Sequence, residues 1–288
     1  MRAAHARILL VFVLFVACVP ARAMAAPGPR IESIPGGAGQ PMQVHVFAPR
    51  ASAPRAAIVL FHGGGWAFGD ASWIHGTARW LAEAGMVAVS VEYRLSDPGG
   101  GGSTPFDAVA DARAAIRWVR QEAARLGVDP GRIAAGGVSA GAHLAAATAA
   151  FDEPFGGEVS ARPDLLVLWS PAVSVAGSGW FRRLAGGVAQ AASLSPDLHV
   201  HRDMPPAILL QGAEDTVTRA AGAERFCARM RQSHVTCELH VYPGVGHLFT
   251  RNLTRQEDPD HAAIDRAVGA RADAEALEFL RGMGFIGS

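Results

Sequence analysis

Three side chains of this 288-residue chain could together perform nucleophilic catalysis. They are Ser139, an acid at Glu214 or Asp215, and His247, and each follows a predicted strand. A serine hydroxyl is a weak nucleophile at neutral pH, so it needs a base to take its proton, and an acid must orient and stabilise that base. The order serine, acid, histidine therefore indicates acyl-transfer chemistry, with the acid open between Glu214 and Asp215.

The serine lies in the pentapeptide Gly137–Gly141, between an apolar run at 132–136 and a helix-forming run that begins at His143. A sharp turn from strand to helix forces the central serine into an unfavourable φ/ψ region, and it requires small residues two positions before and after it. Gly137 and Gly141 meet this requirement. The alternative, an ordinary serine in a glycine-rich loop, does not explain the acid and the histidine that follow in order.

Acyl transfer also needs hydrogen-bond donors for the negative charge that develops on the carbonyl oxygen. The run His62–Gly65 follows an apolar strand, and its glycines allow the backbone to approach a ligand closely. Together with the amide of Ala140, this run could form an oxyanion hole. On its own the triple glycine could equally be a tight turn.

The elements that must position these groups alternate along the chain. Apolar runs and helical spacing predict strands at 30–34, 42–47, 56–61, 86–92, 132–136, 165–169, 207–211 and 235–242, and helices at 71–84, 106–125, from 143, 219–232 and 261–283. Short buried strands alternating with helices predict the α/β class, with a mainly parallel twisted sheet and helices on both faces. Residues 26–288 are expected to form one domain, with ligands outside the carboxyl ends of the strands.

The chain resembles the α/β-hydrolase superfamily, and within it the HGGG-type, hormone-sensitive-lipase-like branch of carboxylesterases and acetyl esterases. The motifs that carry the resemblance are His62–Asp70, Tyr93–Leu95, Asp111–Trp118, Gly137–Leu144, Gly212–Asp215 and Gly246–His247. The resemblance implies Ser139 as nucleophile, Asp215 as the acid and His247 as the base. It also implies that Gly64, Gly65 and Ala140 are the oxyanion donors and that no cofactor is required.

The expected substrate is a small-molecule or polymer-borne ester. Too few residues precede the HGGG motif for the helical cap of the larger relatives, so little or no cap is expected, and the segment 171–206 is the remaining candidate for a small lid. Trp66, Trp180, Phe181 and Leu248 are candidates for a substrate pocket. An open site favours short-chain or polysaccharide-borne acyl groups, while a kynurenine formamidase-like amide hydrolase and a catalytically silent binding protein remain alternatives.

Composition excludes several other functions. The formal net charge is zero and the basic residues are scattered, so no nucleic-acid partner is expected. The chain contains no lysine, which excludes Schiff-base chemistry and a serine–lysine dyad. His199 and His201 could be metal ligands, but no third ligand stands at a recognised spacing, so no metal site is expected.

The N-terminus is typical of a secretory signal peptide at 1–25. A basic head precedes an apolar run from Ile8 to Val19, and small residues follow. Export to the periplasm or the medium is therefore expected, with lipid anchoring through Cys18 as the alternative and no transmembrane anchor after cleavage. In an oxidising compartment Cys227 and Cys237 could form a disulfide, the alternative being two buried thiols.

Overall fold

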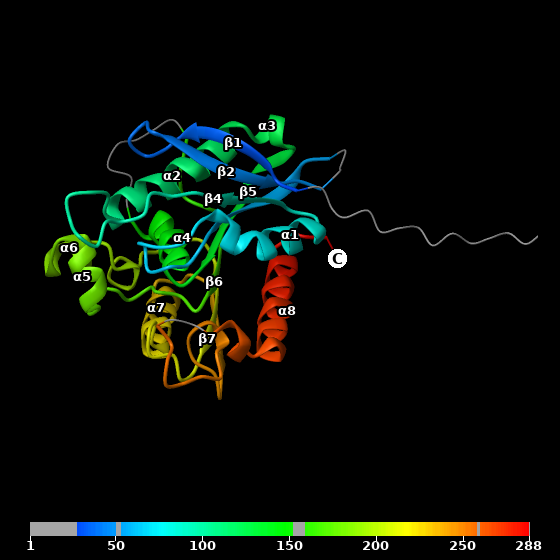
Figure 1. The fold of residues 1–288 in the computed structure, drawn as a ribbon. Coiled ribbons are helices and arrows are strands. Elements are labelled where there is room, and N and C mark those ends of the chain that lie inside the picture. Colours follow the sequence, from blue (N-terminus) through cyan, green and yellow to red (C-terminus); the bar gives the residue numbers. More distant parts are fainter. Residues whose placement is uncertain (1–27, 50–52, 152–158, 258–259, 288) are drawn as a thin grey trace, which may run out of the picture.

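A mixed sheet of eight strands lies at the centre of the part of the chain that the structure describes (Figure 1). This computed structural model describes residues 28–49, 53–151, 159–257 and 260–287. The strand order is β1-β2-β4-β3-β5-β6-β7-β8, in which β1, β2 and β4 pair antiparallel and all later pairs are parallel. The strands are β1 (Arg30–Pro35), β2 (Pro41–Phe47), β3 (Arg55–Phe61), β4 (Val87–Val91), β5 (Val128–Val138), β6 (Leu165–Trp169), β7 (Ala207–Gly212) and β8 (Cys237–Tyr242).

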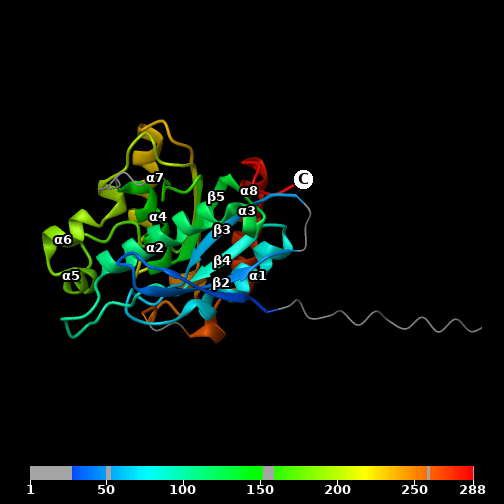
Figure 2. The ribbon, with the colours of Figure 1, turned by 90° about the horizontal axis from the view of Figure 1, so that it is seen from above.

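Helices cover both faces of this sheet (Figures 1 and 2). One face packs against α2 (Pro105–Gln121), α3 (Ala123–Leu126), α4 (Ala140–Ala150) and α7 (Ala220–Gln232), and the other against α1 (His75–Glu83) and α8 (Arg266–Gly282). Burial on both faces explains the continuous apolar runs of the parallel strands, since β4 and β6 are buried at every position. The predicted α/β class with a mainly parallel sheet is therefore confirmed.

The register of the sheet brings the carboxyl ends of its later strands to one edge. Val138 at the end of β5 pairs with Trp169 at the end of β6, and Gly212 at the end of β7 pairs with Tyr242 at the end of β8. The segments that follow these strands carry Ser139, Asp215 and His247. Parallel pairing thus places the three candidate side chains on the same side of the sheet.

Three predicted segments differ from the structure. The helix predicted at 106–125 is divided at Glu122 into α2 and α3, because the backbone of Glu122 leaves the helical region there. The candidate lid at 171–206, for which no helix was predicted, contains α5 (Gly179–Ala185) and α6 (Val188–Ser193). The helix predicted from 261 begins at Arg266, where the Asp265 carboxylate accepts hydrogen bonds from the amides of Ala267 and Val268.

The predicted signal peptide at 1–25, including Cys18, lies outside the described residues. Within the residues that are described, no helix has the length and apolar character needed to cross a membrane.

A disulfide joins Cys227 in α7 to Cys237, the first residue of β8. The two Cα atoms lie 5.4 Å apart, and the bond closes a loop with a sequence separation of 10. Both cysteines are buried, so the bond ties the middle of α7 to the edge strand from inside the core. Closing a loop of this length removes conformational freedom mainly from the unfolded chain.

Removing the bond should lower stability without changing the fold. Cys227→Ala, Cys237→Ala and the double variant should each lose about 2 to 3 kcal/mol of unfolding free energy, because the same loop is opened in all three. Thermal unfolding should show a fall of about 5 to 10 °C. If the double variant instead lost the sum of the unfolding free energies lost by the two single variants, no bond would link the two residues in solution.

Candidate active site

Ser139 occupies a strained turn between β5 and α4. Its φ of 55° and ψ of −115° lie in a region that non-glycine residues rarely adopt. The strand and the helix pack so closely that a Cβ on Gly137 would lie 2.5 Å from the Gly141 carbonyl carbon. A Cβ on Gly141 would lie 2.0 Å from the Phe61 carbonyl oxygen in β3. The two glycines are therefore required by close backbone packing, which holds the serine side chain at the edge of the sheet.

His247 connects the serine to the acid. Its Nε2 lies 2.9 Å from Ser139 Oγ, and its Nδ1 lies 2.8 Å from Asp215 Oδ2. The imidazole is nearly buried, as is Asp215 at 4% exposure. This geometry lets Nε2 accept the hydroxyl proton while Nδ1–H donates to the carboxylate. Of the two acids left open by the residue pattern, the structure brings Asp215 to the histidine, whereas Glu214 Oε2 accepts a hydrogen bond from the Gly244 amide.

The Asp215 carboxylate is held by several donors besides the histidine. Oδ1 accepts hydrogen bonds from the amides of Val217 and Thr218 at 2.9 and 2.7 Å. Oδ2 accepts from Gln211 Nε2 at 3.0 Å and lies 2.8 Å from the Thr218 hydroxyl. Donors on both oxygens stabilise the charged form of a buried carboxylate and fix its orientation. The acid can therefore hold the imidazole in one position.

Gln256 joins the loop of the acid to the loop of the base. Its Oε1 accepts hydrogen bonds from the amides of His247 and Thr216, at 2.9 and 3.0 Å. Its Nε2 donates to the carbonyl of Glu214 at 3.0 Å, and the side chain is buried. A Cβ on Gly246 would lie 2.4 Å from Gln256 Oε1, so glycine at 246 makes this contact possible. No pattern in the sequence points to Gln256, because a single glutamine in a loop carries no motif.

The glycine loop after β3 presents backbone amides close to the serine. A Cβ on Gly63 would lie 3.6 Å from the Ser139 Cβ, and Gly64 and Gly65 have positive φ values of 109° and 60°. Within the described chain, the amides of these two residues donate no hydrogen bond. Ala140 is the first residue of α4, where an amide has no partner in its own helix. The three predicted oxyanion donors are therefore free to bind a developing negative charge.

Buried aromatic side chains support this loop from behind. Trp66 Nε1 donates to His143 Nδ1 at 3.1 Å, and His143 Nε2 lies 2.7 Å from the Leu194 carbonyl oxygen. Burial lowers the pKa of His143 to about 4, so its imidazole is neutral at pH 7 and Nε2 carries the proton. Phe181 packs edge-on against both rings. One neutral histidine thus links the glycine loop, α4 and the segment 171–206.

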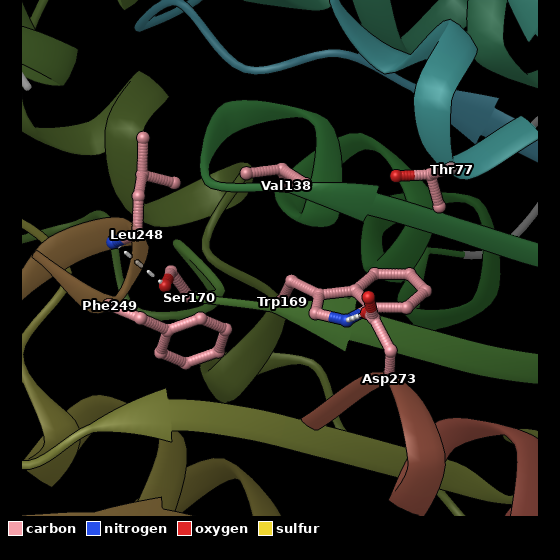
Figure 3. A pocket seen from close by; sticks show the side chains of 7 residues that line it. All are labelled: Thr77, Val138, Trp169, Ser170, Leu248, Phe249 and Asp273. Carbon is pink, nitrogen blue, oxygen red and sulfur yellow. Dashed lines mark hydrogen bonds between the residues drawn. The ribbon is translucent and has the colours of Figure 1, made fainter. Parts of the chain in front are cut away.

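The four residues predicted for the substrate pocket fall into two groups. Phe181 has no exposed surface and Trp66 is 5% exposed, so these two side chains stiffen the glycine loop instead of lining an open pocket. Trp180 is partly exposed, and its Nε1 donates to the Gly65 carbonyl at 2.9 Å. Leu248 lines a cavity beside the site, together with Thr77, Val138, Trp169, Ser170, Phe249 and Asp273 (Figure 3). The segment 171–206 therefore braces the oxyanion donors through Trp180 and His143.

The histidines considered as metal ligands bind backbone oxygens. His199 Nε2 lies 3.1 Å from the Ala192 carbonyl oxygen, and His201 Nε2 lies 3.2 Å from that of Ala149. Among the residues that the structure describes, no three histidine, cysteine or acidic side chains gather in a way that could hold a metal ion. A nucleophile, a base, an acid and free amide donors are all present around Ser139, which is the set of groups that acyl transfer requires.

Gln256 should act as a positioning residue. Replacing it by alanine frees both loops, so we expect Gln256→Ala to slow the phosphonylation of Ser139 by a fluorophosphonate probe about tenfold or more, because small displacements of a base are costly. The control is Gln232→Ala, which removes an exposed glutamine at the end of α7. A labelling rate equal to that of the parent in the folded variant would show that Gln256 does not position His247.

A family model described as the alpha/beta hydrolase fold matches residues 58–251, more than half of the chain. Carboxylesterase NlhH of Mycobacterium tuberculosis is 40% identical over 118 residues, which are 40% of this chain and 34% of the relative. Esterase LipI of the same species is 37% identical over 148 residues, 48% of this chain and 42% of the relative. The matched stretch thus spans only about a third to two fifths of these curated relatives.

Solved structures are similar over nearly the whole chain. Thermogutta terrifontis esterase 2 phosphorylated by paraoxon is 30% identical, with a TM-score of 0.77 and coverage of 92% of this chain and 97% of that one. The same esterase with butyrate bound is 30% identical, with a TM-score of 0.77 and coverage of 91% and 96%. The chain therefore belongs to the α/β-hydrolase family, in its hormone-sensitive-lipase-like branch.

Proposed function

We propose that this protein is a serine carboxylic-ester hydrolase that acts on short-chain or polysaccharide-borne acyl esters. The observation that carries the proposal is the position of His247, which lies within hydrogen-bond distance of both Ser139 Oγ and the buried Asp215 carboxylate. The names of the relatives support it, since they include carboxylesterases and esterases. The proposed mechanism requires no cofactor.

In the first half-reaction Ser139 Oγ attacks the ester carbonyl carbon while His247 Nε2 takes the hydroxyl proton. The amides of Gly64, Gly65 and Ala140 bind the oxygen that becomes negative. His247 then passes its proton to the leaving alcohol oxygen, and an acyl-Ser139 ester remains. Asp215 stabilises the imidazolium that exists between these two proton transfers.

In the second half-reaction water takes the place of the alcohol. His247 removes a proton from the water, the resulting hydroxide attacks the acyl carbonyl, and the same amides bind the oxyanion. Collapse of this intermediate releases the carboxylic acid and returns the proton to Ser139. The same groups can cleave an amide, which is why a formamide such as N-formylkynurenine belongs among the test substrates.

A short acyl chain is favoured by the packing behind the glycine loop. Trp66 and Phe181 fill the space there and contact each other with ring centroids 4.5 Å apart. Both side chains are buried, so neither is open to a long lipid tail. Related structures support a short chain as well, because Thermogutta terrifontis esterase 2 has been solved with propionate and with butyrate bound.

Ser139→Ala should abolish hydrolysis of p-nitrophenyl acetate and butyrate, lowering kcat by about four to six orders of magnitude, since the nucleophile is lost. The control is Ser193→Ala, which changes a serine in α6 outside the site. Steady-state kinetics across acetate, butyrate, octanoate and palmitate esters should show the highest kcat/KM at four carbons or fewer.

Four outcomes would contradict this proposal. Parent-like turnover in Ser139→Ala would exclude the serine mechanism. A kcat/KM that rises toward palmitate would exclude a short-chain site. Hydrolysis of N-formylkynurenine with no hydrolysis of esters would replace the ester substrate by a formamide, while a failure of the fluorophosphonate to label Ser139 would indicate a silent binding protein.

We also propose that the protein is exported through a signal peptide at 1–25 and acts in the periplasm or the medium. The basic and apolar pattern of the N-terminus supports this, as does the Cys227–Cys237 bond, because disulfides persist mainly in oxidising compartments. N-terminal sequencing of protein recovered outside the cytoplasm should give a start at Met24 or Ala26. Retention of the full chain in the cytoplasm, or a lipid on Cys18, would contradict it.

A further inference from the structure

A cavity of about 180 Å³ lies at the ends of β5 and β6, and its lining includes Thr77 of α1 and Asp273 of α8 (Figure 3). Its apolar walls come from Val138, Trp169, Leu248 and Phe249. Its polar groups include the Thr77 hydroxyl and the Asp273 carboxylate, which appear together on one side of the view, with Leu248 and Phe249 on the other (Figure 3). The remaining polar side chain of the lining, Ser170, lies beside Leu248 and accepts a hydrogen bond from its amide (Figure 3). A mostly apolar lining with a few polar groups is a common design of ligand sites.

The position of this cavity indicates which part of an ester substrate, acyl or alcohol, it could receive. Val138 directly precedes the serine, and Leu248 directly follows the histidine. Since His247 Nε2 must deliver a proton to the leaving oxygen, the alcohol part of the substrate lies on the side of Ser139 where the histidine loop lies. The glycine loop, with Trp66 and Phe181 behind it, packs with the core on the other face of the sheet. The cavity is thus placed to receive the alcohol part.

Asp273 has an unusual environment for a surface helix. One carboxylate oxygen accepts a hydrogen bond from Trp169 Nε1 at 3.2 Å, and the second accepts none from the described residues. Within the described part of the chain no cation pairs with it, and burial raises its pKa. The Thr77 hydroxyl likewise has no hydrogen-bond partner among these residues. Two polar groups in one cavity are therefore available to a ligand.

Taking ester hydrolysis at Ser139 as the reaction, we propose that this cavity binds the alcohol part of the substrate and selects a six-membered ring that carries a hydroxyl group, as a sugar unit does. The size fits, because a cavity of about 150 Å³ holds a benzene ring. A carboxylate accepts the proton of a hydroxyl, and the Thr77 hydroxyl can donate to the oxygen of the same group.

The test compares acetates that differ in one substituent. Cyclohexyl acetate, trans-1,4-cyclohexanediol monoacetate and trans-4-aminocyclohexyl acetate share their acyl group and their ring. We expect kcat/KM for the diol monoacetate to exceed that for cyclohexyl acetate about tenfold or more, because a hydrogen bond to a charged group has this effect. The amine tests the alternative ligand, because an ammonium group could pair with the same carboxylate.

Two conservative variants then locate the effect. Asp273→Asn keeps an acceptor for Trp169 but loses the acceptor for the substrate hydroxyl, and Thr77→Val removes only the hydroxyl. Each should reduce the ratio of the two kcat/KM values about threefold or more, and the double variant should bring the ratio close to one. The ratio is independent of the fraction of folded enzyme. The matched control, Glu278→Gln, changes an exposed acid on the same helix and should leave the ratio unchanged.

Ligand-observed NMR on Ser139→Ala separates the cavity from the reaction. trans-1,4-Cyclohexanediol should show saturation transfer that Asp273→Asn removes, and cyclohexanol should show less. Acetate hydrolysis with a ratio near one, unchanged in Asp273→Asn, would overturn this proposal and leave the esterase standing. If the diol bound through Asp273 but the protein hydrolysed no ester, the diol site would stand and the esterase proposal would be overturned. A preference for the amine that Asp273→Asn removes would reassign the cavity to cations.

Discussion

The site depends on the close contact of three backbone segments beneath Ser139. A single carbonyl oxygen, that of Phe61 in β3, lies where a side chain on Gly137 or Gly141 would have to be. Strand, turn and helix can come this close only without Cβ atoms, and the closeness in turn fixes the serine at a φ of 55°. Surrounding packing must hold such a conformation, and the fully buried α4 provides that support. The same contact brings the glycine loop after β3 beside the nucleophile.

Most of this arrangement could be predicted from the sequence, because it depends on local patterns. Apolar runs located the eight strands to within a few residues, and the parallel order followed from their alternation with helices. The elbow, the histidine and the glycine loop have recognisable spacing around Ser139. The choice between Glu214 and Asp215 needed the resemblance, since both acids follow the same strand and only the register of the loop decides which one reaches the histidine.

What the sequence could not show are contacts between distant loops and the exposure of individual side chains. Gln256 clamps two loops from a third, and no local pattern marks a residue whose partners are backbone groups elsewhere. Trp66 and Phe181 were predicted for a pocket because aromatic residues near a motif suggest one, yet tertiary packing buried them. Asp273 was not identified either, because on sequence alone it is one more acid on an amphipathic helix. Only the structure shows that Trp169, at the end of β6, donates a hydrogen bond to the Asp273 carboxylate.

The attachment of the segment 171–206 to the glycine loop has a consequence for how this protein can change. Trp180 holds the Gly65 carbonyl and Leu194 holds His143, so the wall that would shape acyl preference is also the support of the oxyanion donors. An insertion or a bulky replacement in this wall would change the space for the acyl group, and it would also disturb the amides that stabilise the transition state. New acyl specificities on this scaffold are therefore expected to arise together with losses in turnover, whereas the α1 and α8 side can vary with less penalty. Specificity for the alcohol part of an ester can therefore change in this protein at a smaller cost in turnover than specificity for the acyl part.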